Sequence, residues 1–426
     1  MKSLLVKINS KLNAQGGFLK AVSVLVGGTA FAQLVGLICL PILTRLYRPE
    51  DYAVLGIYVA IVSILSVIAC LRLEIAIPIP EKDEEAKSLL ILSLLSNLFI
   101  VLILYLILFF LNPILQNFYI IQKLDIWIWF VPLGVFLSGL YSALQYWSTR
   151  RKRFKEIAQT RMTQALFNNG ASLSVGFFTG GFWGLILGQL FSFGGGLLKL
   201  GYSTYKDTIS VKKNNSLKTV LYKYQDFPKY STFEALANTS AIQLPLIIIA
   251  SFLVGPELGY LMLAMKVLGI PMGLIGSAMS QVYLSHASTY YQKGELFEYT
   301  KSILNKILKL VVLPFILLLL ISPYIFGYIF GKQWADIGYY ISAMVPWYFM
   351  QILSSPVSMS LHVIGKQKIA LVLQLIGFFL RVICLIGISV LNHKWVIQYY
   401  VISGFVFYLI YMLCVLYFVK KSKFVN

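Results

Sequence analysis

Long apolar runs recur through almost the whole chain and restrict its fold more than any other feature. A spanning helix needs about 20 mostly apolar residues, and twelve runs meet that length: 20–43, 53–77, 88–111, 124–147, 160–180, 182–203, 229–254, 258–282, 306–330, 338–362, 369–391 and 395–419. Charged residues make up only 12% of the sequence, about half the share of a soluble domain. The pattern predicts an all-α integral membrane protein of about 12 transmembrane helices.

The basic residues predict the orientation of these helices. Of the 36 Lys and Arg, 28 lie in the terminal segments and alternate gaps or at the ends of the runs that border them, and segments rich in basic residues face the cytoplasm. The opposite loops hold Arg45, Arg48, Lys123, Lys332 and Lys394. Both termini are therefore expected in the cytoplasm. Because topology accounts for the +20 net charge, we expect no nucleic-acid partner.

A polar, Lys-rich gap divides the runs into two sets of six. We expect an N-terminal lobe, a cytoplasmic linker and a C-terminal lobe, over residues 1–203, 204–228 and 229–426. Pro49-Glu50 follows the first run and Pro256-Glu257 follows the seventh. This correspondence indicates two repeated halves with the same orientation in the membrane.

Charged residues inside apolar runs are the main functional candidates, because each costs roughly 2.5–3.5 kcal/mol even on a lenient insertion scale. Arg381 lies near the middle of its run, too deep to reach water easily, and is a candidate ligand for an anion. A structural pair with a neighbouring polar group is the alternative for Arg381. Lys266 is also a candidate ligand, although it lies nearer the outer end of its run and its stem can extend toward the interface.

Three further charges, Arg72, Glu74 and Glu234, lie near the cytoplasmic ends of their runs. Arg72 is a third candidate ligand, and we expect it to approach Glu234, in the other half of the chain, when the protein closes on the cytoplasmic side. At this depth, snorkelling or an ion pair at a helix end is the alternative. Pro41 and Pro245 interrupt corresponding runs and are hinge candidates, although proline also bends a helix without any motion.

The sequence has no arrangement typical of an active site or a metal site. His286, His362 and His393 are scattered, and the four cysteines lie inside apolar runs without metal-type spacing. We expect no catalytic residue, no metal and no cofactor. A membrane polysaccharide polymerase or acyltransferase is the alternative from another class. The first would need a large outer loop and the second a catalytic His at the end of a span.

The first outer loop and its surroundings resemble a known family. Leu43-Thr44-Arg45 and Pro49-Glu50-Asp51-Tyr52 are followed by Leu71-Arg72-Leu73-Glu74, and then by Ala76, Ile77, Pro80, Glu85 and Ala86. This pattern is similar to the N-terminal signature of the polysaccharide-biosynthesis, or O-antigen (Wzx-type), flippases of the MOP transporter superfamily. Ala53 departs from the pattern, since many members have Gly there.

The resemblance implies two six-helix lobes (MOP/MATE-like) around a central cavity, in the bacterial cell inner membrane. It implies a non-enzymatic carrier that moves undecaprenyl-diphosphate-linked oligosaccharide, an O-antigen or capsule repeat unit, to the outer leaflet by alternating access. The cavity residues would be Arg381, Lys266 and Arg72, and the gate or coupling candidates are Glu74, Glu234 and Arg45. Transport would be coupled to H+, Na+ or the membrane potential. Membrane lipids and the polysaccharide polymerase machinery are the further partners expected.

Two other transporter functions belong to the same superfamily, namely lipid II carriage and drug export. An exporter of cationic drugs would need buried carboxylates to outnumber buried basic residues. The deepest charged residues of this chain are Lys266 and Arg381, which favours an anionic substrate.

Overall fold

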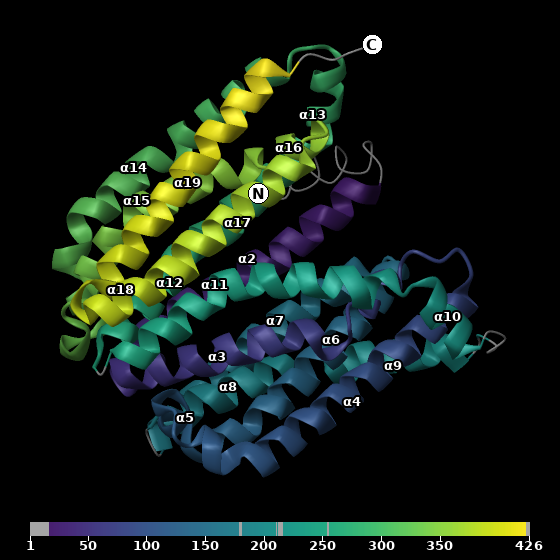
Figure 1. Ribbon diagram of the computed structural model, residues 1–426, viewed down its shortest axis with the longest axis horizontal. Coiled ribbons are helices and arrows are strands. Elements are labelled where there is room, and N and C mark those ends of the chain that lie inside the picture. Colours follow the sequence, from purple (N-terminus) through teal and green to yellow (C-terminus); the bar gives the residue numbers. More distant parts are fainter. Residues whose placement is uncertain (1–16, 179–180, 210, 212–215, 254, 423–426) are drawn as a thin grey trace, which may run out of the picture. The chain divides into compact units, whose positions relative to one another are not determined.

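The chain is all helical in a computed structural model that describes residues 17–178, 181–209, 211, 216–253 and 255–422, and these residues contain no strand (Figure 1). Two compact units are formed. The first unit comprises the described residues up to Leu46 together with Tyr58–Thr239, and the second comprises Tyr47–Ile57 together with the residues from Ser240 onward. Helix α3 therefore begins in the second unit and ends in the first.

The helices of the first unit are α2 (Gly17–Leu46), most of α3 (Pro49–Ala69), η1 (Leu73–Ala76), α4 (Asp83–Leu115), α5 (Tyr119–Leu124), η2 (Asp125–Trp129), α6 (Phe130–Arg150), α7 (Phe154–Phe178), α8 (Trp183–Gly194), α9 (Leu197–Ile209), α10 (Leu217–Lys223), η3 (Phe227–Ser231) and the start of α11 (Thr232–Phe252). The second unit contains the rest of α11, then α12 (Glu257–Pro271), η4 (Met272–Gly276), α13 (Ser277–Gln292), α14 (Leu296–Phe330), η5 (Lys332–Trp334), α15 (Ile337–Val357), α16 (Ser360–Val363), α17 (Gln367–Phe378), η6 (Phe379–Ile383), α18 (Cys384–Leu391), η7 (His393–Trp395) and α19 (Val396–Lys421).

Ten helices among the described residues are long and apolar enough to cross a membrane. Helices α7 and α15, with 25 and 21 residues, also have the necessary length but are less apolar. The predicted all-helical, multi-pass membrane fold is confirmed, and the predicted count of twelve spans is not. The two termini, residues 1–16 and 423–426, lie outside the described residues, so their cytoplasmic location stays a prediction.

Small residues allow the helices of the first unit to pack closely. A Cβ on Gly28 of α2 would lie 2.9 Å from the Ala158 Cα of α7, and one on Gly188 of α8 would lie 2.7 Å from the Asn168 carbonyl oxygen of α7. Apolar side chains give helices no hydrophobic preference for one another over lipid, so close backbone contact is a main source of association. Helix α7 is held between α2 and α8 in this way.

The basic run after α6 binds acidic residues at the ends of two other helices. Arg150 Nη2 lies 2.8 Å and Arg151 Nη1 3.0 Å from Asp83, at the start of α4. Arg153 Nη2 lies 2.7 Å from Asp207, near the end of α9. Single exposed ion pairs contribute little, but connected pairs constrain geometry. This network fixes the ends of α4, α6 and α9 relative to one another.

The residues predicted as a linker, 204–228, contain the end of α9 and all of α10. Lys223 Nζ of α10 lies 2.9 Å from Glu85, and Lys87 Nζ donates to the Thr208 carbonyl oxygen at 2.8 Å. The described part of this segment is therefore packed on the first unit. The predicted lobe boundaries themselves stay a prediction.

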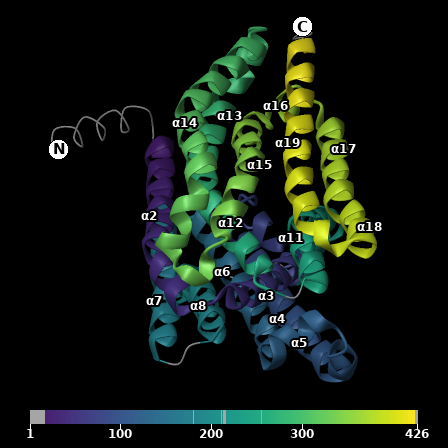
Figure 2. The same ribbon diagram turned by 90° about the vertical axis from the view of Figure 1, so that its left-hand side faces the viewer.

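Helix α15 is the centre of the second unit, where it packs against α12, α14 and α19. Figure 2 shows α14, α15 and α19 running alongside one another. Two glycines permit this packing: a Cβ on Gly404 of α19 would lie 2.3 Å from the Trp347 ring, and one on Gly338 would lie 2.2 Å from the Ser322 carbonyl oxygen. Trp347 is thus pressed between α15 and α19.

The segment Tyr47–Ile57 is bound to the second unit by its backbone. Trp334 Nε1 donates to the Tyr47 carbonyl oxygen at 3.3 Å, and a Cβ on Gly259 would lie 1.9 Å from the Pro49 carbonyl oxygen. Tyr52 and Tyr260 both pack edge-on to Trp334, with ring centroids 5.2 and 5.8 Å away. The tyrosines that follow the Pro-Glu motifs of the two halves therefore pack on the same indole, that of Trp334.

Candidate functional site

Arg381 occupies an irregular turn in the second unit. Helices α17 and α18 are joined by η6, a single π-helical turn over Phe379–Ile383. One residue more than an α-helical turn holds is accommodated in such a turn, and π turns occur frequently at functional sites. The Arg381 residue is only 6% exposed.

Three aromatic rings from two neighbouring helices surround the Arg381 guanidinium. Its Cζ lies 4.8 Å from the ring centroid of Trp347 on α15, and 5.2 and 5.3 Å from those of Phe407 and Tyr408 on α19. Each distance is within the range of a cation–π interaction. We call Trp347, Phe407 and Tyr408 the aromatic cage.

Hydrogen-bond donors in this cluster lack acceptors. Arg381 Nε and Nη2 and Trp347 Nε1 are buried without a hydrogen-bond partner. Within the described part of the chain, no carboxylate lies within 4.0 Å of the Arg381 guanidinium. A buried donor without an acceptor costs about 1–3 kcal/mol, so the cluster is suited to receive an anion. Among the described residues no ion pair is formed here, and the polar neighbour of the guanidinium is the Tyr408 hydroxyl.

Lys266 belongs to a second cluster of the same unit. Its Nζ lies 5.9 Å from the ring centroid of Tyr52, whose hydroxyl is buried without a hydrogen-bond partner. The side chain of Lys266 is exposed at the surface of the second unit. Tyr348 connects this region with the aromatic cage, because its hydroxyl donates to the Met265 carbonyl oxygen at 3.4 Å and its ring packs on Trp347.

Arg72 and Glu74 lie together in the first unit, in a turn rather than in a spanning helix. The predicted end of the run 53–77 is wrong, because α3 already ends at Ala69. Leu71 and Arg72 then adopt left-handed backbone conformations, with φ of 51° and 58°, which are uncommon and strained for residues other than glycine. This turn brings Arg72 Nη1 to 3.8 Å from Glu74 Oε1.

Glu74 is the more buried partner of this pair. Its side chain is 6% exposed and Oε2 has no hydrogen-bond partner. Burial raises the pKa of the Glu74 carboxyl, and this effect outweighs the lowering by the Arg72 charge. A carboxyl of this kind binds a proton more readily than an exposed one.

The other gate candidates and the hinge candidates lie in α2 and α11. Glu234 is exposed in the first turn of α11, and among the described residues the ion-pair partner of Arg72 is Glu74, not Glu234. The expected approach of Arg72 and Glu234 on closure stays a prediction. Arg45 is exposed, and its Nη1 donates to the Pro41 carbonyl oxygen at 2.9 Å. Pro41 and Pro245 lie inside α2 and α11.

The aromatic cage was not predicted from the sequence. Trp347 and Phe407 lie in different apolar runs, and nothing in a single sequence indicates which runs are neighbours. The only available signal was the deep position of Arg381, since a buried cation needs partners. The three Trp, Phe and Tyr side chains fill that need in place of a carboxylate.

Residues 42–338 match the family model described as polysaccharide biosynthesis protein. The chain belongs to the polysaccharide biosynthesis protein family. The match includes the Arg45–Glu85 signature region and Lys266, while Arg381 lies beyond it. No curated protein matches the sequence significantly.

Solved structures show the fold of this polysaccharide biosynthesis protein. The lipid II flippase MurJ, in an inward closed conformation, is 15% identical with a TM-score of 0.69, over 93% of this chain and 87% of that one. An inward-facing multidrug resistance MATE family transporter of the MOP superfamily is 13% identical with a TM-score of 0.62, over 93% and 95%. A MATE transporter of Vibrio cholerae is 12% identical with a TM-score of 0.52, over 97% and 98%. The predicted MOP-superfamily fold is confirmed.

Proposed function

We propose that this protein is a flippase that moves an undecaprenyl-diphosphate-linked oligosaccharide, an O-antigen or capsule repeat unit, across the bacterial inner membrane by alternating access. Membership of the polysaccharide biosynthesis family and the MOP-superfamily fold support a flippase or exporter. The single observation that carries the substrate class is the cluster of buried donors without acceptors around Arg381.

The chemistry of the substrate fits these donors. A diphosphate is an anion that cannot cross hydrocarbon unaided, and charged hydrogen bonds to phosphate oxygens are strongest where water is scarce. The planar guanidinium of Arg381 presents Nε and Nη2 side by side, as bidentate contact with a phosphate requires. Trp347 Nε1 would supply a third donor.

The aromatic cage makes the site reversible. Cation–π contacts hold a desolvated guanidinium without supplying a hydrogen-bond acceptor, whereas a bidentate phosphate contact supplies charge-assisted hydrogen bonds. Arg381 can therefore rest against Trp347, Phe407 and Tyr408 and exchange these contacts for the substrate. A carboxylate partner would compete with the diphosphate far more strongly.

Other charged residues would assist transport. Lys266 and Arg72 are further cations for the diphosphate, and Arg45 and Glu234 remain gate candidates. Glu74, whose pKa is raised by burial, is the residue best suited to proton coupling, while Na+ or the membrane potential are the other driving forces. The oligosaccharide would pass to the polysaccharide polymerase machinery on the outer side. No step of this cycle requires a catalytic residue or a cofactor.

A lipid II carrier is the second candidate, because MurJ is a lipid II flippase and its fold agrees best among the three structures described. A drug exporter is less favoured, because the buried charge with unpartnered donors is a cation. A membrane polymerase or acyltransferase fits neither the fold nor the site.

Reconstituted vesicles test the proposal. A fluorescent undecaprenyl-diphosphate oligosaccharide is placed in one leaflet, and its appearance in the other is measured by accessibility to a membrane-impermeant quencher. We expect the wild type and Lys332→Gln to flip it, Arg381→Ala to be inactive, and Arg381→Lys to retain part of the rate because the charge survives without the bidentate geometry. Equal rates for Arg381→Ala and the wild type would remove Arg381 as the ligand. Absence of flipping by the wild type would refute the function.

A further inference from the structure

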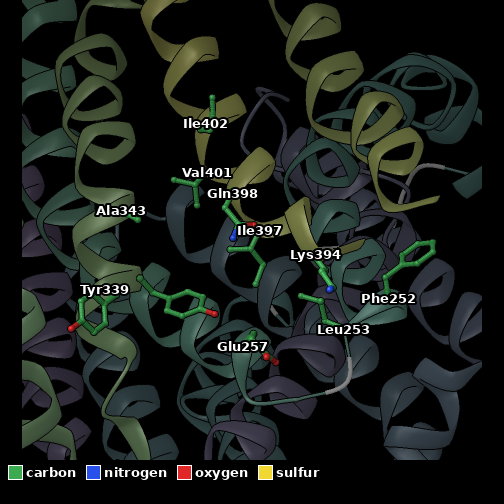
Figure 3. A pocket seen from close by; sticks show the side chains of 11 residues that line it. Phe252, Leu253, Glu257, Tyr339, Ala343, Lys394, Ile397, Gln398, Val401 and Ile402 are labelled. Carbon is green, nitrogen blue, oxygen red and sulfur yellow. The ribbon is translucent and has the colours of Figure 1, made fainter. Parts of the chain in front are cut away.

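A large groove opens in the second unit, separate from the aromatic cage. Its volume is about 860 Å³, within the range of about 300–1,000 Å³ typical of small-molecule sites. The end of α11, the start of α12 and the first turns of α15 and α19 form its walls, together with η7 (Figure 3). In the predicted topology, all these helix ends lie on the outer side of the membrane.

Polar groups from three different elements face this groove. Glu257 comes from α12, Lys394 from η7 and Gln398 from α19, and their side chains point into the same hollow (Figure 3). Glu257 Oε2 is buried without a hydrogen-bond partner. In the part of the chain that the structure describes, neither Glu257 nor Lys394 forms an ion pair within 4.0 Å. An acceptor and a cationic donor thus stand in one hollow without neutralising each other.

Flat and apolar surfaces complete the groove. Tyr340 also lines it, and its ring contacts that of Tyr260, with centroids 5.4 Å apart and planes tilted by 52°. Ile397 and Val401 add an apolar strip along α19. A ring already held by such a contact can bind a ligand at little cost in side-chain entropy.

These groups select among ligands. A phosphate would satisfy Lys394 but would be repelled by Glu257, and a simple amine would have the opposite mismatch. A sugar hydroxyl is both donor and acceptor, so adjacent hydroxyls of one ring satisfy the carboxylate, the ammonium and the Gln398 amide together. The C–H face of a pyranose is apolar and stacks on an aromatic ring such as Tyr340. The lining therefore matches a carbohydrate better than an ion.

We propose that this groove binds the sugar part of the transported molecule on the outer side, with Glu257, Lys394 and Gln398 as its hydrogen-bonding residues and Tyr340 as its stacking platform. The inference rests on the proposed function for the identity of the cargo. It adds a glycan site to the diphosphate site at Arg381. Selectivity among oligosaccharides would then be determined at the groove, and the diphosphate would be recognised at the cage.

Saturation-transfer NMR on the full chain in nanodiscs tests the inference. The probes are a panel of hexoses, 6-deoxyhexoses and N-acetylhexosamines, with inorganic diphosphate followed separately by phosphorus NMR. We expect at least one sugar to receive saturation from the wild type. Gln398→Ala and Glu257→Ala should weaken its binding by about tenfold, since each removes a hydrogen bond that involves the sugar hydroxyls or a charge. Gln398 is exposed, so its variant does not depend on a disturbed core.

Matched controls separate this inference from the proposed function. Lys332→Gln removes an outer-side charge outside the groove and should leave sugar binding unchanged, whereas Lys394→Gln should weaken it. Arg381→Ala should lose diphosphate binding and keep sugar binding. The groove is overturned if no sugar gives a signal that the groove variants reduce, even when diphosphate binding depends on Arg381. Sugar binding that needs the groove, with diphosphate binding indifferent to Arg381→Ala, would instead overturn the role of Arg381.

Discussion

Replacing Arg381 by Met should make the protein more stable and inactive in transport. Met has an unbranched side chain, no hydrogen-bond donor and favourable contacts with aromatic rings. It would occupy the same aromatic cage of Trp347, Phe407 and Tyr408 without a charge. The prediction follows because Arg381 is buried with two guanidinium nitrogens that have no hydrogen-bond partner.

The magnitude follows from the contacts of the guanidinium. Three cation–π contacts together stabilise the folded protein by about 2–4 kcal/mol, and Met loses them. The two buried nitrogens without acceptors cost about 1–3 kcal/mol each, and Met removes that cost. Sulfur–aromatic contacts return about 1 kcal/mol. The net change is a gain of about 2 kcal/mol, or roughly 2 °C in the melting temperature of a chain of 426 residues.

A fluorescence-detected melting curve of the purified protein in detergent measures this change. Arg161→Met is the matched control, because Arg161 Nη1 donates to Thr29 Oγ1 at 2.6 Å between α7 and α2. Loss of that charged hydrogen bond should lower the melting temperature. If Arg381→Met is destabilised as much as Arg161→Met, then Arg381 is a structural residue and not a ligand for an anion.

Three further predictions concern packing, protonation and topology. Gly259→Ala should destabilise the protein by about 1–3 kcal/mol, because its Cβ would lie 1.9 Å from the Pro49 carbonyl oxygen, whereas Gly269→Ala meets open space and should not; melting curves compare them. Glu74→Gln should raise the melting temperature at neutral pH and not below about pH 4. Because burial raises the folded-state pKa of Glu74, its contribution to stability is complete below the unfolded-state value of about 4.3 and is lost as the pH rises toward the folded-state value; a constant difference across pH would contradict this. A phosphatase fused after Asn426 should be inactive, and an active fusion would place the C-terminus outside.

Apolar runs predicted the membrane fold well because hydrocarbon imposes a length and a composition on each span. The breaks around Gly181 and Gly255 were also predictable, since glycine interrupts a helix, and both α7–α8 and α11–α12 separate there. The end of α3 was not predictable. It depends on left-handed conformations of Leu71 and Arg72, and neither residue type signals such a turn.

The candidate site was predictable only in part, for a physical reason. The cost of burying a cation singles out Arg381 in any sequence, but its compensation comes from rings on α15 and α19 that are distant along the chain. The groove lined by Glu257, Lys394 and Gln398 was even harder to predict, because in the sequence Lys394 and Gln398 are ordinary residues near a helix end. Their proposed role depends on Glu257, which belongs to a different helix and lines the same groove.

The division of α3 between the two units has a consequence for how such a chain can be cut. A fragment that begins at Ser240 lacks the Tyr47 carbonyl oxygen that Trp334 binds and the Pro49 backbone against which Gly259 packs. The segment Tyr47–Ile57 thus belongs by its contacts to the second unit, although it precedes most of the first unit along the chain. Halves expressed separately should therefore be degraded rapidly. When they are co-expressed, the C-terminal half should fold only after the segment Tyr47–Ile57 of the N-terminal half binds to it. A gene fission event would meet the same barrier, so selection is expected to keep both halves in one polypeptide.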